Sequence, residues 1–232
     1  MATAIFAVNS FRFGRGSPLK VTKEKAAENR AALVQAAGRL FRERGIDGVG
    51  VAEISKKAGL THGALYAQFP SKEALAAEAF ESGLKPGLEQ MTSGRDGRPP
   101  ALADFLDYYL SLEHRDNLAT GCPMAASASE VARQDKVVGD QFADGFEQSV
   151  AVMERGLGAS SVKAEKRQRA MAMMVAMIGG VAAARAVAKT DPKLSNEILR
   201  AVRRIVGEVG GHEGQIDGAQ RRARATRKRA QR

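Results

Sequence analysis

Residues 51–75 read VAEISKKAGLTHGALYAQFPSKEAL, a pattern typical of two short helices joined by a tight turn. Apolar side chains recur at helical spacing in the first part, and Gly59 stands where a left-handed helix end favours glycine. Thr61 is the expected N-cap of the second helix. Phe69-Pro70 is its expected end, because the residue before a proline disfavours the α conformation. Such a helix pair can place its second helix in the DNA major groove.

The segment AGLTHGALYAQFPSKEAL resembles the DNA-binding segment of the TetR family of bacterial transcriptional repressors. The shared features are a glycine turn, a small second helix ending in Leu-Tyr, an aromatic-proline pair and a Lys-Glu-Ala-Leu helix start. The resemblance covers residues 28–80 and is specific there; further along it is one of length and helical character. It implies an all-α fold, with an N-terminal three-helix helix-turn-helix DNA-binding domain and a C-terminal helical ligand-binding and dimerisation domain.

Charge and composition divide the chain into four segments. We expect a disordered basic arm at 1–20, the DNA-binding domain at 21–70, the helical body at 71–211 and a disordered basic tail at 212–232. Residues 1–70 carry 11 Lys/Arg against 5 Asp/Glu, the body 18 against 19, and the tail 7 against 2. The basic ends indicate a polyanion partner. Each end either adds contacts with DNA phosphates or is only a solvated tail.

The composition also bears on the location of the protein. A single cysteine excludes an internal disulfide, and a reducing cytoplasm is the expected location. The longest uncharged run, 170–184, is shorter than the ~20 residues of a membrane span, so we expect no membrane partner. The N-terminal MATAIFAV has its charges after the apolar part, the reverse of a secretory signal, and no export is expected.

The resemblance assigns DNA-facing roles to the second helix and its surroundings: Thr61, His62, Gly63, Ala64, Tyr66, Ala67 and Gln68, with Lys72 on the next helix. Gln68 can pair with adenine, a contact worth ~1–3 kcal/mol of discrimination, and His62 can donate to guanine or a phosphate. Tyr66 and Lys72 can contact the DNA backbone. Gly63 lowers helix stability by roughly 1 kcal/mol relative to Ala, which indicates close approach to DNA. The alternatives are a solvated His62 and a Tyr66 packed in the core.

Gly50 occupies the N-cap of the first of these helices, where TetR proteins often have Thr or Ser. It offers a phosphate only the backbone N–H groups and the helix dipole behind them. The preceding helix, capped by Thr22 and ended by Gly45, carries basic residues on its outer face that we expect to be mostly solvated: Lys23, Lys25, Arg30, Arg39, Arg42 and Arg44.

The body is predicted to consist of long apolar-rich helices: one from Ser71 to Met91 interrupted at Lys85-Pro86-Gly87, one over 101–114 after a loop at 92–100, and others over 137–156, 163–189 and from Asp191. Apolar character and position select candidate residues for an effector pocket: Phe105, Tyr108, Tyr109, Met124, Phe142, Phe146, Met173, Met174 and Met177. Few charges fall among them, so we expect a mostly apolar or aromatic small molecule. Ordinary core packing is the alternative for each methionine.

Cys122 precedes a helix rich in small residues. A thiolate at a helix N-terminus has a lowered pKa and reacts more readily, so Cys122 is a candidate redox or electrophile sensor; the alternative is a small buried hydrophobe.

In the TetR family the last two helices pair with those of a second subunit. The same homodimer here would place two recognition helices ~34–36 Å apart over a near-palindromic operator.

The sequence favours a sequence-specific DNA-binding regulator, by resemblance a repressor released by its effector. One alternative is a nonspecific nucleic-acid-binding structural protein, which would rest on the basic ends alone and leave the body without a role. The other is an enzyme. The three histidines, His62, His114 and His212, have no second ligand at metal spacing, and no nucleophile or phosphate-loop motif is present. We therefore expect no metal, cofactor or catalytic residue, although His114 beside Glu113 and Asp116 is the best candidate.

Overall fold

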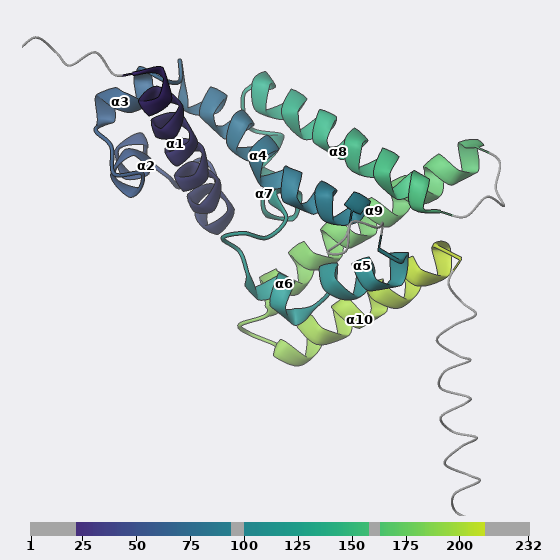
Figure 1. Cartoon of the computed structure of the whole chain (residues 1–232). Coiled ribbons are helices and arrows are strands. Elements are labelled where there is room, and N and C mark those ends of the chain that lie inside the picture. The colour runs from purple at the N-terminus through teal and green to yellow at the C-terminus, as the bar shows by residue number, and fades with distance from the viewer. Residues whose placement is uncertain (1–21, 94–99, 158–162, 212–232) are drawn as a thin grey trace, which may run out of the picture.

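The computed structural model describes residues 22–93, 100–157 and 163–211, which form ten helices and no strand (Figure 1). The expected all-α fold is confirmed. The basic arm and tail, and most of the loop expected at 92–100, lie outside the described residues. The helices are α1 (Lys23–Arg44), α2 (Val51–Lys57), α3 (His62–Tyr66), α4 (Lys72–Ser93), α5 (Leu102–Tyr109), α6 (Leu112–Asp116), α7 (Pro123–Val131), α8 (Lys136–Gly156), α9 (Lys163–Val187) and α10 (Pro192–Val209).

Local signals fix the ends of the first helices as predicted. The hydroxyls of Thr22 and Thr61 accept hydrogen bonds from backbone N–H groups in the first turns of α1 and α3. Gly45 and Gly59 have positive φ angles of 79° and 71°, which a residue with a side chain rarely adopts. α3 is shorter than expected and ends at Tyr66. The chain turns inward after it, because the Phe69 side chain is buried in the core.

α1, α2, α3 and the start of α4 enclose one hydrophobic core at one end of the molecule (Figure 1). Leu33, Ile54, Leu65 and Leu75 from the four helices are each fully buried there. Further along, α4 contributes residues such as Phe80 to a second core with helices of the body. The single helix α4 therefore connects the DNA-binding fold to the rest of the chain.

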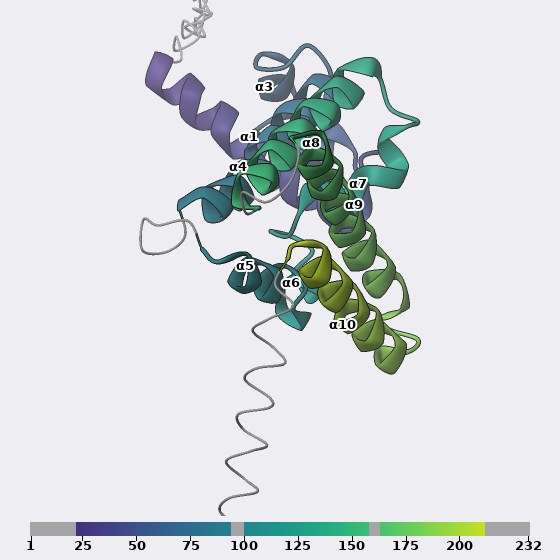
Figure 2. The same ribbon diagram turned by 90° about the vertical axis from the view of Figure 1, so that its right-hand side faces the viewer.

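The body is built on α4, α8, α9 and α10, each packed against the next. α9 and α10 run side by side, as Figure 2 shows, and are antiparallel, because Arg169 near the start of α9 donates to the carbonyl of Val209 at the end of α10. The shorter helices α5, α6 and α7 complete the body. Among the described residues, α9 alone is long and apolar enough to cross a membrane, but core helices have the same composition, and α9 packs against α8 and α10.

Two predicted boundaries in the body are wrong. α4 continues through Pro86 without the expected break, and Leu84 and Leu88 on either side of the proline pack on the same core. The helix expected over 101–114 is two helices, α5 and α6. The chain breaks between them because the Ser111 hydroxyl accepts a hydrogen bond from the backbone N–H of His114 and caps α6.

Candidate nucleic-acid interface and ligand cavity

The outer surface of α3 carries most of the predicted DNA-facing residues. Gly50, Thr61, His62, Gly63, Tyr66 and Ala67 are exposed, while Ala64, Gln68 and Lys72 are partly buried. The Tyr66 side chain is 51% exposed, so the alternative that it packs in the core is wrong. Its ring meets the ring of His62 edge to face at 5.2 Å. Leu65 is instead the fully buried residue that holds α3 on the core.

Gly63 and Gly50 have no intramolecular reason to be glycine. A Cβ atom built on either residue would have no neighbour within 4 Å. Neither residue has a positive φ angle. The backbone at Gly50, before α2, and at Gly63, in α3, is therefore free to approach a surface outside the chain.

Arg30 of α1 fixes the chain just after α3. Its Nη1 donates to the carbonyl of Gln68 at 2.6 Å, its guanidinium lies 4.1 Å from the Phe69 ring centroid, and it forms an ion pair with Glu78 of α4. One side chain thus joins α1, α4 and the end of α3. A contact between residues 38 positions apart leaves no signal in the local sequence.

The expectation that the basic face of α1 is mostly solvated is wrong for Arg42 as well, whereas Arg44 is exposed. Arg44 pairs with Glu53 of α2. Arg42 is half-buried against the loop before α7, where it donates two hydrogen bonds to the Ala119 carbonyl. Burial lowers the pKa of Arg42 from its ordinary value. The charge of Arg42 is tolerated in this partly buried position because its guanidinium donates to a carbonyl oxygen.

α7 also holds the turn between α1 and α2. The Glu130 carboxylate accepts a hydrogen bond from the backbone N–H of Asp47 at 2.9 Å. The Gln134 amide, just beyond α7, donates to the Asp47 carboxylate at 3.0 Å. The loop before α7 and the end of α7 thus both contact the helix-turn-helix domain.

A cavity of about 100 Å³ lies in the body beneath α4 and borders this same loop. Five of the nine candidate pocket residues line it: Phe105, Tyr108, Tyr109, Met124 and Met174. The other four belong to the surrounding core instead: Phe142, Phe146, Met173 and Met177. A larger hollow of about 1500 Å³ along α1 and α4 is open to solvent, and none of its described lining residues is aromatic.

His114 forms one wall of the cavity and is 5% exposed. Its Nε2 accepts a hydrogen bond from the backbone N–H of Cys122 at 3.2 Å, so the ring proton is on Nδ1, which donates to the Tyr109 carbonyl at 2.6 Å. Burial lowers the pKa of His114. Both ring nitrogens are bound to the backbone, which gives His114 a structural role in shaping the cavity.

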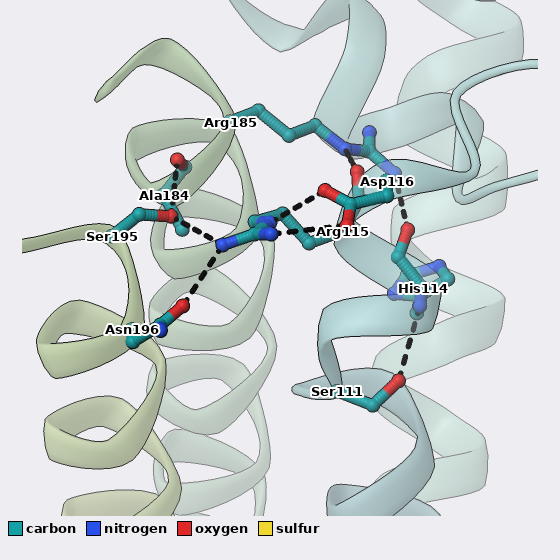
Figure 3. A network of polar contacts seen from close by, with 8 residues as sticks. All are labelled: Ser111, His114, Arg115, Asp116, Ala184, Arg185, Ser195 and Asn196. Atoms are coloured by element: carbon teal, nitrogen blue, oxygen red, sulfur yellow. Dashed lines mark hydrogen bonds and ion pairs between the residues drawn. The ribbon is translucent and has the colours of Figure 1, made fainter. Parts of the chain in front are cut away.

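Arg185 of α9 lies behind the same wall (Figure 3). Its Nε donates to the Arg115 carbonyl at 2.9 Å and its Nη2 to the His114 carbonyl at 3.0 Å. Arg115 itself binds Asp116, Ser195 and Asn196, and it ties α6 to α10. The sequence pattern did not single out either arginine, because their partners are up to 81 residues away.

Cys122 also lines the cavity, as the partly buried N-cap residue of α7. Its role as a redox or electrophile sensor stays a prediction. Among the described residues, no group of three or more His, Cys, Asp or Glu side chains converges where a metal ion could bind.

Comparison with known proteins identifies the family of the N-terminal unit. A sequence model described as "Bacterial regulatory proteins, tetR family" matches residues 33–79, which run from α1 into α4 and include most of the predicted DNA-facing surface. The DNA-binding domain belongs to the TetR family.

The curated TetR-family relatives match this chain mainly in its N-terminal part. The HTH-type transcriptional regulator TtgR of Pseudomonas putida is 41% identical over 61 residues, which cover 26% of this chain and 29% of TtgR. AcrR of Shigella flexneri is 40% identical over 60 residues, which cover 26% of this chain and 28% of AcrR. The chain therefore spans less than a third of the length of these relatives.

Solved structures of TetR-family proteins share the fold over most of the chain. Reduced NemR of E. coli has a TM-score of 0.61 at 21% identity, covering 78% of this chain and 96% of NemR. A TetR regulator from Chloroflexus aurantiacus has a TM-score of 0.64 at 21% identity, covering 83% and 97%. At this level of identity the similarity establishes the TetR fold of the body as well as of the N-terminal domain.

Proposed function

We propose that this protein is a homodimeric transcriptional regulator, a repressor that leaves its near-palindromic DNA operator when a small, mostly apolar effector fills the cavity. The observation that carries the proposal is the exposed face of α3. Leu65 anchors this helix from below and Arg30 holds its end, so Thr61, His62 and Tyr66 stay outside on a rigid element. Rigid presentation of a short helix is what major-groove recognition requires.

The residues of this surface divide into two roles. Gln68 and His62 are the candidates for reading base edges, while Tyr66, Lys72 and the N-terminus of α2 at Gly50 bind phosphates and position the domain. Gly63 and the small side chains Ala64 and Ala67 allow the backbone to come close to the bases. The proposal thus gives a use to the two glycines that no contact within the chain explains.

Dimerisation through α9 and α10 follows from their outer faces. Val175 and Met171 on α9, and Ile205 and Leu194 on α10, are large apolar side chains with 57%, 36%, 48% and 42% of their surface exposed. Gly179 and Ala183, which follow Val175 along α9, are exposed as well and permit close helix approach. A second copy of this surface would cover both faces, as a two-fold interface requires.

The contacts of Arg42, Glu130 and Asp47 give the effector a route to the DNA-binding domain. The loop that lines the cavity is bonded to α1, and α7 is bonded to the turn before α2. A ligand that displaces this loop changes the position of α1 relative to the body. If the effector binds the displaced arrangement more tightly than the DNA-bound arrangement, the affinity for DNA falls by the coupling free energy between the two sites.

The protein is expected to act in the cytoplasm, where it meets DNA, and to catalyse no reaction. His114, the residue best suited to catalysis by type, uses both ring nitrogens for backbone hydrogen bonds.

Salt dependence of DNA binding separates the proposal from the nonspecific alternative. Binding to the DNA upstream of its own gene and to random DNA of equal length would be compared from about 50 to 200 mM salt. The regulator keeps a discrete footprint at the higher salt while binding to random DNA is lost. Equal loss on both DNAs would favour the nonspecific alternative.

A further inference from the structure

Two buried hydrogen-bond donors have no acceptor, one on a residue that lines the cavity and one on a residue that contacts the cavity wall. They are the hydroxyl of Tyr109 and Nη1 of Arg185, and within the described part of the chain these are the only buried side-chain N or O atoms in this condition. Tyr109 is 7% exposed and lines the cavity. Burial of an unpaired donor costs free energy, so native proteins rarely keep such groups without a function.

The Arg185 guanidinium is close to the cavity wall. Its Nη2 binds the carbonyl of His114, and a Cβ atom on Gly121 would lie only 2.6 Å from that nitrogen. His114 and Gly121 both line the cavity. Arg185 and Tyr109 also act on each other electrostatically, since each influences the pKa of the other.

The charge of Arg185 is not neutralised by its hydrogen-bond partners. Nε and Nη2 bind neutral backbone carbonyls, and the nearest carboxylate, Asp116, is engaged by Arg115 through two hydrogen bonds. His114 is neutral in this arrangement. The Cys122 thiol is near the Tyr109 hydroxyl and, after burial, contributes to the raised pKa of Tyr109, but by distance and angle the hydroxyl has no hydrogen-bond partner. The guanidinium of Arg185 therefore places a positive charge behind the wall formed by His114 and Gly121, next to the unpaired hydroxyl of Tyr109.

We propose that the effector carries an anionic acceptor group, of the carboxylate type, that receives hydrogen bonds from the Tyr109 hydroxyl and from Nη1 of Arg185. This inference rests on the proposed function of the same cavity and specifies the chemistry of its ligand. Phe105, Met124 and Met174 line the rest of the cavity and match a short hydrocarbon portion. The ligand is thus a small amphiphilic acid.

The volume sets the size of this acid. About 100 Å³ is less than the ~150 Å³ of an engineered cavity that binds benzene, a molecule of six non-hydrogen atoms. Butyrate, which like benzene has six non-hydrogen atoms, is at the upper end of this size. Butyramide is an uncharged probe of nearly the same size and shape, and butylamine is a positively charged one. These three probes differ in the one property that the inference concerns.

The test is the affinity of the three probes for the full-length protein, measured by NMR titration. Butyrate is expected to bind at least about tenfold more tightly than butyramide, because it alone brings a negative charge to the guanidinium of Arg185, and butylamine is expected to bind weakest. Tyr109→Phe should remove about tenfold of the preference for butyrate. The matched control Tyr108→Phe changes a tyrosine at the same cavity that is 39% exposed, and it should keep the preference.

A second readout needs no ligand. Tyr109→Phe removes an unpaired buried hydroxyl without changing the ring, so the melting temperature of the free protein should rise. Equal affinity of the three probes, no binding of butyrate at tens of millimolar concentration, or an unchanged preference in Tyr109→Phe would overturn the inference. A lower melting temperature of Tyr109→Phe would do so too, because it would mean that the hydroxyl is satisfied.

The DNA footprint of the same samples distinguishes this inference from the proposed function. A footprint without butyrate binding would reject the anionic ligand and leave the regulator intact. Butyrate binding without any footprint would reject the regulator and leave a carboxylate site of another purpose.

Discussion

Arg42 of α1 donates two hydrogen bonds to the carbonyl of Ala119, at 2.8 Å from Nε and 2.6 Å from Nη2. Ala119 is followed directly by Thr120, Gly121 and Cys122, which line the cavity. Gly83 of α4 also leaves room for Arg42, because a Cβ atom there would collide with Nη1. The DNA-binding helix bundle is thus hydrogen-bonded through Arg42 to the loop that lines the proposed effector site.

Replacement of Arg42 by methionine should weaken the response to effector more than the affinity for DNA. The change leaves the partly buried Ala119 carbonyl without its donors, and we expect a loss of about 1 kcal/mol in the free energy of unfolding. Urea denaturation measures this loss, and footprint titration with added butyrate measures the response. Arg39→Met, at an exposed position of the same helix, is the control. A full effector response in Arg42→Met would show that the signal takes another route.

Gly63→Ala should separate stability from DNA binding. An alanine at this exposed helical position should stabilise the fold by about 0.5–1 kcal/mol, since its Cβ meets nothing in the chain. When the protein binds DNA, the same methyl group keeps α3 away from the bases. We therefore expect the affinity for the operator to be about tenfold weaker, a loss of about 1.4 kcal/mol in binding free energy. Gly139→Ala in α8 has equally open space and should leave DNA affinity unchanged. Undiminished binding by Gly63→Ala would place α3 away from the bases.

Val175→Glu should dissociate the dimer while the monomer stays folded. Val175 is 57% exposed on α9, so a carboxylate is harmless there in one chain but unpaired and desolvated between two. We expect the dimer dissociation constant to rise at least about a hundredfold, or 2.7 kcal/mol, measured by analytical ultracentrifugation. Val137→Glu, an exposed valine at the start of α8, is the control. A dimer that tolerates Val175→Glu would have its interface elsewhere.

The burial of His114 predicts a pH dependence of stability. Its pKa is lowered in the folded state, so the unfolded chain binds a proton at a higher pH than the folded one. The contribution is fully present above the unfolded pKa of about 6.5 and is lost as the pH falls through the lower folded value. Unfolding free energies between pH 5 and 8 should therefore fall on acidification, and His114→Gln should flatten that part of the curve. An equal slope in the variant would assign the effect to other groups.

The sequence predicted those features that depend on neighbouring residues. The caps at Thr22 and Thr61 and the glycine ends at Gly45 and Gly59 were correct, because each needs only a hydroxyl or a positive φ angle within one turn. The end of α3 was misplaced, since the burial of Phe69 depends on the tertiary core.

Long-range partners explain most of what the sequence could not provide. Arg30 and Arg42 looked like solvated charges because their carbonyl acceptors are 38 and 77 positions away. The aromatic residues of α5 line the cavity, whereas Phe142 and Phe146 pack in the core, since apolar character alone does not separate a cavity wall from a filled core.

The exposed surface of α3 is the centre of the account, and one measurement tests it most directly. The footprint of the wild-type protein on the DNA upstream of its own gene, at ~150 mM salt, would be compared with those of Tyr66→Ala and Gln68→Ala. The account predicts a discrete wild-type footprint that each substitution weakens while fold and dimer persist. Uniform binding to all DNA, unchanged by either substitution, would contradict it.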